Sequence, residues 1–133
     1  MLYMLKHGKK IRIDKHTYFD FIWPDSNLVS ENVLNNNSIV CKLYYRNVSM
    51  MFTGDIEKIA EEKILEKYKD NKAILKSTIL KVGHHGSKTS SSEEFINCVN
   101  PKVALIGVGA KNKFGHPNEE VLERFNKLRC DDL

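Results

Sequence analysis

Residues 77–87, STILKVGHHGS, join a short apolar run to two adjacent histidines that lie between glycines. The run predicts a buried β-strand, because about four to eight apolar and β-branched residues bounded by turn residues are typical of one. The histidine pair is harder to explain by packing, since the chain has only five histidines and neighbouring imidazoles between glycines give no evident structural gain. We therefore interpret His84 and His85 as functional residues.

Two other segments place a polar side chain just beyond an apolar run. Residues 48–54, VSMMFTG, end at Asp55, and residues 103–109, VALIGVG, are followed by the loop AKNKF and then His116. In a parallel or mixed α/β sheet, residues just beyond the carboxyl ends of strands gather on one rim, which is where ligands bind. We expect Asp55, the histidine pair and His116 to share that rim.

The rest of the chain predicts a mixed α/β fold. Residues 11–21 suggest short strands that stop at Pro24, residues 24–37 a surface loop, and residues 38–54 a hairpin that turns near Arg46 and Asn47. From Ile56 the apolar residues recur at helical spacing, so a helix should follow Asp55 directly, with Asp55 at the N-cap. Residues 90–99 and 116–128 predict two further helices. Strand and helix alternate after residue 55, which excludes a helical bundle.

Composition sets the remaining limits. A chain of 133 residues with 41% hydrophobic and 29% charged residues is expected to form one folded domain. The formal net charge of +4 gives only a weak preference for anionic partners. No signal peptide or membrane-spanning run is evident, so we expect a soluble chain. Cys41, Cys98 and Cys130 are odd in number and widely spaced, which predicts free thiols.

A carboxylate and imidazoles on one rim form a plausible site for zinc or manganese, because these ions take imidazole nitrogen and carboxylate oxygen as ligands. The hydroxyls of Ser87, Thr89 and Ser90 add groups that can bind a phosphate or a carboxylate. Each single residue has an ordinary alternative. Asp55 could serve only as a helix cap and His116 only as a loop residue.

Several linked motifs resemble one known family. In order, they are FIWP, NNNSIVCKLYYRNVSMMFTGD, ILKVGHHGSKTSSSEEF and NPKVALIGVGAKNKFGHPNEEVLERF, and they cover residues 21 to 128. They resemble the carboxyl-terminal part of the metallo-β-lactamase-like domain of ComEC-type competence proteins and its stand-alone hydrolase relatives. The resemblance implies an αββα sandwich of two mixed sheets with a metal site at the rim.

The resemblance also implies roles for individual residues. The aspartate of the TGD turn, Asp55, would bridge two metal ions, Zn²⁺ or Mn²⁺. His85 would be a further metal ligand and His84 a catalytic or substrate-side residue, although the reverse assignment of the pair stays open. His116 of the GHP turn would stabilise developing negative charge. The predicted substrate-binding residues, drawn partly from the motifs and partly from the hydroxyls above, are Asn37, Ser38, Ser87 and His116.

The chain departs from the family at one point. The family's HxHxDH or HxDxDH cluster, which precedes the region matched here and supplies the first metal site, has no counterpart in this sequence. We therefore expect residues 1–133 to form a single partial domain, the second half of the sandwich, and three explanations stay open: a fragmented gene, a truncated sequence, or a chain that needs the amino-terminal half as partner. We also expect the isolated chain to be unstable, dimeric or prone to aggregation, because sheet surface is left uncovered.

Two functions follow from this reading. The first is a fragment of a metal-dependent hydrolase that, in an intact ComEC-type protein at the bacterial cell membrane, cleaves DNA phosphodiesters during DNA uptake; a stand-alone relative would act on a smaller ester. The second is a non-catalytic fragment or interaction module. In either case the chain alone is expected to be inactive.

Overall fold

We describe the fold from a computed structural model of the chain, which describes residues 4, 5 and 7–131. The elements run in the order β1 (Lys10–Arg12), β2 (Thr17–Trp23), α1 (Val33–Asn36), β3 (Val40–Tyr45), β4 (Val48–Phe52), α2 (Lys58–Lys67), η1 (Lys72–Leu75), β5 (Ile79–Lys81), η2 (Gly83–Gly86), α3 (Glu93–Val99), β6 (Val103–Leu105) and α4 (Glu119–Asp131), where η marks a 3₁₀ helix. The predicted mixed α/β class is confirmed.

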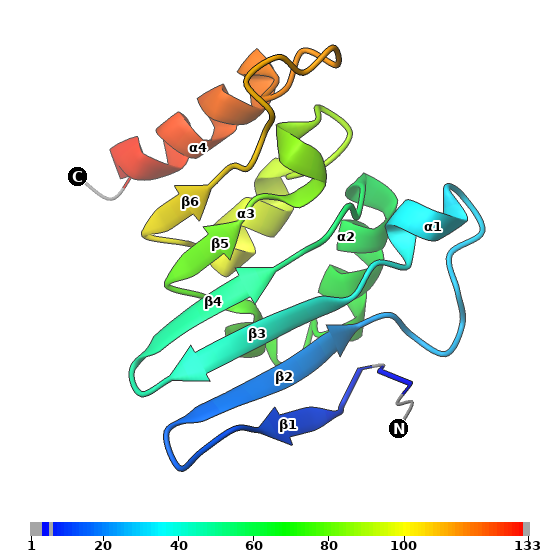
Figure 1. The fold of residues 1–133 in the computed structure, drawn as a ribbon, viewed down its shortest axis with the longest axis vertical. Coiled ribbons are helices and arrows are strands. Elements are labelled where there is room, and N and C mark those ends of the chain that lie inside the picture. The colour runs from blue at the N-terminus through cyan, green and yellow to red at the C-terminus, as the bar shows by residue number, and fades with distance from the viewer. Residues whose placement is uncertain (1–3, 6, 132–133) are drawn as a thin grey trace.

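The described strands form one six-stranded sheet in the order β1-β2-β3-β4-β5-β6 (Figure 1). The pairs from β1 to β4 are antiparallel, whereas β4 and β5 and then β5 and β6 pair in parallel. The carboxyl ends of β4, β5 and β6 therefore reach the same edge of the sheet. This edge carries the segments that hold Asp55, the histidine pair and His116.

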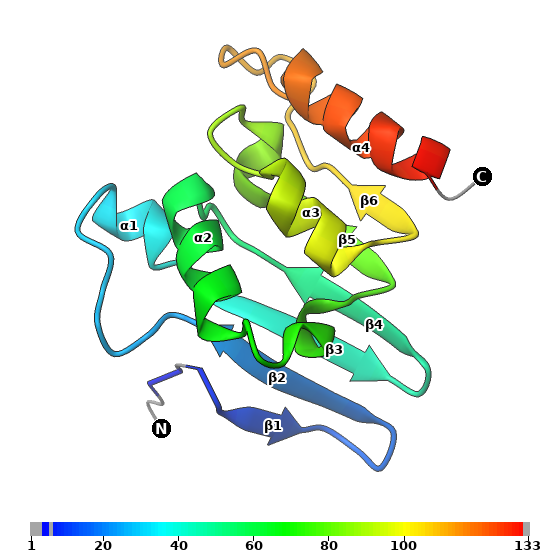
Figure 2. The ribbon, with the colours of Figure 1, turned by 180° about the vertical axis from the view of Figure 1, so that it is seen from behind.

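Helices cover one face of this sheet. Seen from behind, α2 and α3 lie in front of the strands, and α4 lies beside β6 at the end of the sheet (Figure 2). Their apolar residues pack with alternate strand residues in a core, because burying apolar area is the main driving force of folding. The buried members are Ile22, Trp23, Val29, Val40, Met51, Ile56, Ala60, Ile64, Leu75, Leu80, Val82, Phe95, Ile96, Val99, Val121 and Phe125.

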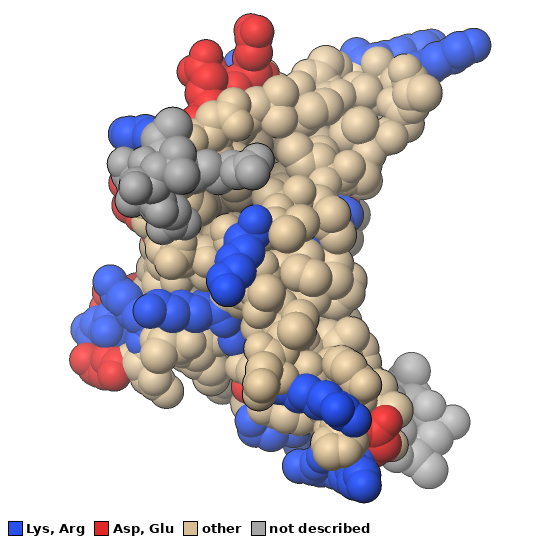
Figure 3. Space-filling view, turned by 90° about the vertical axis from the view of Figure 1, so that its left-hand side faces the viewer, with Lys and Arg blue, Asp and Glu red and all other residues tan. Residues whose placement is uncertain are grey.

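The opposite face of the sheet, which we call the open sheet face, is not covered by any described helix (Figure 1). Met51 and Leu80 point into the core, so the rows on either side of theirs point away from it. The register places two rows on the open sheet face, namely Phe19, Leu43, Met50, Ile79 and Val103, and Phe21, Cys41, Phe52, Lys81 and Leu105. Nine of these ten residues are apolar. Figure 3 shows the adjoining side of the molecule, on which Lys and Arg side chains lie at the lower end and across the middle of a mostly uncharged surface.

The described architecture is thus one sheet with helices on one side, consistent with a partial αββα sandwich. The second sheet of such a sandwich is not among the described residues. Two apolar rows facing outward are unusual for a chain that folds alone, because soluble monomers rarely expose contiguous apolar patches larger than a few hundred Å². This face is the property of the fold that most needs an explanation.

Most elements lie where the sequence predicts them. The strands before Pro24, the hairpin with its turn at Arg46, and the helix capped by Ser92, whose hydroxyl accepts from the Phe95 amide, are confirmed. Two expectations were wrong. The predicted loop 24–37 contains the short helix α1, and α2 begins at Lys58 with Glu57 at its N-cap, so Asp55 does not cap it.

Among the described side chains Cys41 and Cys98 are free thiols, whereas the side chain of Cys130 lies outside the described part. No described helix is both long and apolar enough to cross a bilayer.

Lys42 is an unusual member of the helix-covered face, because it is a lysine only 2% exposed. Its Nζ donates to the carbonyl oxygens of Ile74 and Lys76 near the end of η1 and lies 4.6 Å from the centre of the Tyr44 ring. Burial lowers the pKa of Lys42 to about 8, although the Asp20 carboxylate opposes this shift. The amine ties η1 to the sheet at the cost of a buried charge.

This buried amine predicts a dependence of stability on pH. The pKa of Lys42 is about 8 in the folded chain and 10.5 for an ordinary lysine, so the unfolded chain binds more protons between these values and stability rises with pH across that window. From pH 7.5 to 9.5 we expect the free energy of unfolding to rise by about 2 kcal/mol relative to the Lys42→Met variant. Urea unfolding of both proteins at the two pH values measures this. Parallel pH profiles for the two proteins would contradict it.

Candidate metal-binding site

Asp55 lies in the turn between β4 and α2. Its backbone amide donates to the Ser38 hydroxyl over 3.2 Å, and the preceding Gly54 has a φ of 55°. A Cβ on Gly54 would lie 2.6 Å from the Cβ of Ser38, so only glycine allows the two segments to approach this closely. Ser38 therefore fixes the turn that presents Asp55, whose side chain is 45% exposed.

The histidine pair lies in a left-handed turn within η2. His84 has a φ of 46°, His85 a φ of 55° and Gly86 a φ of 78°. The two histidines thus adopt the same left-handed conformation as Gly86. Left-handed backbone costs a non-glycine residue about 1–2 kcal/mol, and such strain clusters at functional sites. The turn is held against β4 by the His84 amide, which donates to the Gly54 carbonyl over 3.0 Å.

His85 points at Asp55. Its Nδ1 lies 2.7 Å from the carbonyl oxygen of Gly107, which follows β6, and its Nε2 lies 3.7 Å from Oδ1 of Asp55. A carbonyl only accepts hydrogen bonds, so Nδ1 is the protonated nitrogen and, in the neutral ring, Nε2 keeps a lone pair directed at the carboxylate. This is the arrangement in which metal-binding histidines are usually oriented, with the second ring nitrogen donating to a carbonyl or carboxylate.

The spacing of these two atoms fits a shared cation. Ligand atoms about 2.1 Å from a zinc ion and separated by a tetrahedral angle lie about 3.4 Å apart. The 3.7 Å between His85 Nε2 and Asp55 Oδ1 is slightly longer than this, so a small shift of either side chain would let both atoms reach one ion. Within the described part of the chain, however, no group of three or more His, Cys, Asp or Glu residues is close enough to hold a metal ion. The described residues therefore fit as two ligands of a larger set.

The side chain of His84 lies beside Glu57 and His116. Its Nδ1 is buried, has no hydrogen-bond partner among the described residues, and lies 3.9 Å from Oε2 of Glu57. Its ring meets the His116 ring edge to face, with 6.0 Å between the centres. The two imidazoles, although adjacent in sequence, thus have different neighbours. His85 lies beside Asp55, and His84 lies beside Glu57 and His116.

Glu57 is a site residue that the sequence analysis missed. Its Oε1 accepts from the side-chain amides of Asn32, over 2.7 Å, and Asn36, over 3.4 Å. Burial acts to raise the pKa of Glu57, but hydrogen bonds from Asn32 and Thr89, the nearby His84 and Asn36 together lower it. The carboxylate is therefore held ionised beside His84. Its position two residues after Asp55 was the signal available, but the expected helix placed it inside a first turn.

His116 stands at the end of the loop 107–118. Asn112 closes this loop, because its side chain donates to the His116 carbonyl over 2.8 Å and accepts from the His116 amide over 3.0 Å. The Phe114 ring stacks on the His116 ring with 5.8 Å between centres. The structure thus brings His116 to His84, as expected for a shared rim.

The predicted substrate-binding residues form hydrogen bonds within the protein. Asn37 accepts from the Val29 amide and donates to the carbonyls of Val29 and Val33, so it braces the loop before β3. The Ser38 hydroxyl accepts a hydrogen bond from the Asp55 amide. Ser87 is 6% exposed and its hydroxyl lies 3.0 Å from that of Thr89, which is exposed at the rim. Their contact with a substrate remains a prediction.

The serine-rich loop after the histidine pair is clamped from two helices. Glu61 of α2, only 1% exposed, accepts from the amides of Ser91 and Ser92, and Arg124 of α4 donates to the carbonyls of Ser90 and Ser91. The Ser90 hydroxyl is also used, since it donates to the Ile56 carbonyl. The loop that carries Ser87 and Thr89 is therefore held in place by a carboxylate from α2 and a guanidinium from α4.

The two remaining histidines lie apart from the site. His16 is exposed in the β1–β2 turn, and His7 has its Nε2 3.4 Å from Oδ1 of Asp25.

One edge of the sheet carries a carboxylate and imidazoles beyond the ends of parallel strands, which is the arrangement of an α/β protein with a candidate metal site. The profile of the Metallo-beta-lactamase superfamily matches residues 5–109, and the chain belongs to this superfamily. Its sequence is of the ComEC type. It is 40% identical over 93 residues to ComE operon protein 3 of Bacillus subtilis, 36% over 119 residues to competence protein ComA of Neisseria gonorrhoeae, and 36% over 95 residues to recombination protein 2 of Haemophilus influenzae.

These matches cover 70%, 86% and 71% of this chain but only 12%, 16% and 11% of the respective relatives. The chain thus spans a small part of the length of the proteins it resembles. Properties of those whole proteins do not transfer to it directly.

Proposed function

We propose that the chain forms the carboxyl-terminal half of a metal-dependent phosphodiesterase domain that acts on DNA. The observation that supports this most is the His85 ring, which donates through Nδ1 to Gly107 and directs Nε2 at Asp55. An imidazole fixed in this tautomer beside a carboxylate is prepared for a cation rather than for packing. The choice of DNA rests on the relatives, two of which are similar proteins named for competence or recombination.

In this proposal Asp55 and His85 hold Zn²⁺ or Mn²⁺. A bound divalent cation supplies a water of lowered pKa and neutralises charge on the phosphate. His84, the neighbour of His85 in the chain, and His116 beside it would contact the substrate, where an imidazole N–H donates a hydrogen bond to a phosphate oxygen. Glu57, which lies 3.9 Å from His84 and accepts a hydrogen bond from the Thr89 side chain, holds a negative charge beside these imidazoles.

The open sheet face gives the partner of this half. We propose that the amino-terminal half of the domain packs on the rows that run from Phe19 to Val103 and from Phe21 to Leu105, forming the second layer of the sandwich. A catalytic zinc site usually takes three protein ligands and a water, and the described residues bring two together. The same partner would therefore cover the apolar rows and complete the ligand set.

A non-catalytic interaction module is the second candidate. It is favoured by the lack of a three-ligand group among the described residues. In that case the face and the rim would serve only to bind another protein.

Reconstitution distinguishes the two candidates. The chain is mixed with a matching amino-terminal half that carries an HxHxDH cluster, and hydrolysis of bis-p-nitrophenyl phosphate is measured with Zn²⁺, with Mn²⁺ and with chelator. We expect metal-dependent activity only in the mixture, reduced at least about 100-fold by Asp55→Ala, because the metal ions supply most of the catalysis. His16→Ala, an exposed histidine outside the site, is the matched control. A folded mixture that binds no metal and stays inactive would exclude the hydrolase and favour the non-catalytic interaction module.

A further inference from the structure

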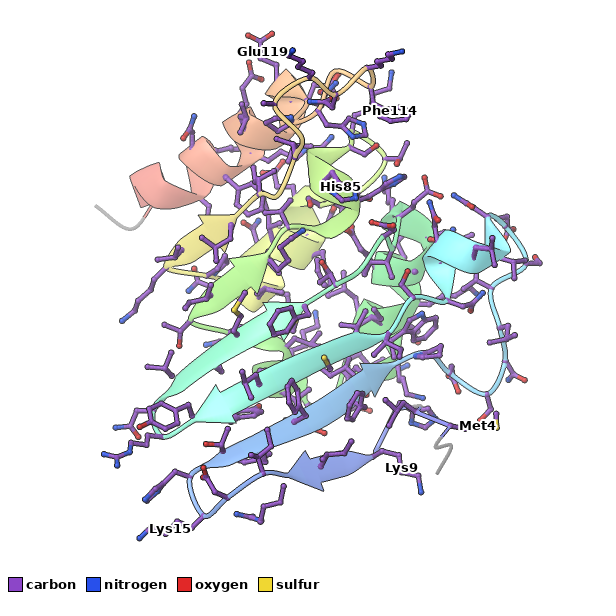
Figure 4. All side chains as sticks on the ribbon, viewed as in Figure 1. Met4, Lys9, Lys15, His85, Phe114 and Glu119 are labelled. Carbon is purple, nitrogen blue, oxygen red and sulfur yellow. The ribbon has the colours of Figure 1, made fainter. Side chains whose placement is uncertain are left out.

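Phe114 is the exposed aromatic side chain at the rim of the site. It is 81% exposed, and its ring lies over that of His116 at 5.8 Å with 28° between the planes. In Figure 4, Phe114 and His85 lie on the same edge of the molecule, beyond the ends of β5 and β6. A single exposed apolar residue needs no explanation by itself. The groups around the Phe114 ring, however, indicate a role for it.

Three rings form a row that leads outward from the site. His84, partly buried beside Glu57, meets His116 edge to face at 6.0 Å, and His116 stacks on Phe114 at 5.8 Å. Most of the Phe114 ring is left to solvent, since the residue is 81% exposed. The row therefore ends in an apolar ring whose centre lies 5.8 Å from that of the nearest imidazole, His116.

The loop around Phe114 holds this surface in place and makes it basic. Asn112 bonds to the Gly109 carbonyl and to both backbone groups of His116, which bridges the loop on either side of Phe114. Lys111 and Lys113, both exposed, flank the ring in sequence. An aromatic surface between cations is the combination with which proteins bind single-stranded nucleic acid, because bases stack on the ring and phosphates lie against the charges.

We propose that Phe114 is a stacking platform for a nucleobase next to the phosphodiester held at the site, and that Lys111 and Lys113 contact the neighbouring phosphates. The inference rests on the proposed function and adds that the substrate is a single strand. A base in a duplex is stacked on both sides and cannot reach the ring, whereas a base in a single strand is free to do so.

The test is binding of a fluorescein-labelled oligothymidylate to the full chain, followed by anisotropy without added metal. Phe114→Ala should weaken binding by about 5- to 50-fold, whereas Phe114→Tyr and Phe114→Trp should stay within about threefold of the wild-type affinity. Tyr45→Ala is the matched control, since Tyr45 is 52% exposed, carries the Arg46 guanidinium 5.5 Å from its ring and ends β3 away from the rim. It should bind as the wild type does.

Two further measurements separate stacking from a general effect. With an oligonucleotide of abasic sugars, Phe114→Ala and wild type should bind equally weakly, because no base is left to stack. Lys111→Ala and Lys113→Ala should each reduce the slope of log affinity against log salt by about 0.7.

The inference is overturned if Phe114→Ala binds the thymidylate as tightly as wild type, if it loses affinity equally for the abasic strand, or if no protein binds the strand at all. These outcomes leave the proposed function standing when the reconstituted domain hydrolyses bis-p-nitrophenyl phosphate, which has no base. Unchanged far-ultraviolet circular dichroism and melting temperature of Phe114→Ala exclude unfolding as the cause of a loss.

Discussion

Alanine in place of His85 is expected to weaken binding of Zn²⁺ or Mn²⁺ by more than about 100-fold, since loss of an outer partner alone costs a metal site about 10- to 100-fold. The reason is geometric. His85 directs Nε2 at the Asp55 carboxylate from 3.7 Å, with the ring held through Nδ1 by the Gly107 carbonyl. Isothermal titration of the chain, alone and with the amino-terminal half, measures the loss.

The neighbouring histidine provides the decisive comparison. His84 faces Glu57 and His116 instead of Asp55, so His84→Ala should reduce metal affinity by less than about tenfold, as expected for a residue outside the ligand set. Asp55→Ala should match His85→Ala. If His84→Ala abolished binding and His85→Ala did not, the roles of the two imidazoles would be reversed.

The second large effect is expected at Glu61. This carboxylate is buried and accepts from the amides of Ser91 and Ser92. Glu61→Ala leaves both donors buried without a partner, and each unsatisfied buried group costs about 1–3 kcal/mol. We expect the free energy of unfolding to fall by about 2–5 kcal/mol, as measured by urea denaturation.

The adjacent glutamate is the matched control. Glu62 is exposed and its nearest charged partner, Lys58, lies 3.9 Å away on the same helix, so Glu62→Ala should change stability by less than about 0.5 kcal/mol. Glu61→Gln, which keeps one acceptor oxygen, should fall between the two and remain folded. Hydrogen exchange at the Ser91 and Ser92 amides should speed up in Glu61→Gln. Equal stability of Glu61→Ala and Glu62→Ala would show that the clamp contributes nothing.

The sequence predicted the elements because their signals are local. Apolar runs bounded by turn residues marked β3, β4 and β5, and the spacing of Ile59, Ala60 and Ile64 marked α2. The boundary of α2 was wrong, because Asp55 is a favourable cap by residue type, yet its amide is taken by Ser38 and the chain makes a further turn before Lys58. Capping preference is a weak guide where a turn is fixed by a distant segment.

Glu57 and Glu61 show which contacts near the site could not be predicted from the sequence. Both lie in a sequence with many charged residues, but Glu57 accepts hydrogen bonds from Asn32 and Asn36, and Glu61 is buried and accepts from the amides of Ser91 and Ser92. Their partners lie more than 20 residues away in sequence. No local pattern encodes such a contact.

By itself, the sequence determined the order of strands and helices, the superfamily, and the presence of an aspartate and paired histidines after successive strands, because periodicity, turn residues and motifs are properties of neighbouring residues. Only the tertiary structure decided that His85 rather than His84 faces Asp55, that Phe114 extends the row of imidazoles, and that two apolar rows stay uncovered by the described helices. Those facts depend on backbone conformation in the η2 turn and on carbonyls and rings brought in from other strands and loops. They depend on contacts between residues far apart in sequence, and local sequence patterns do not predict such contacts.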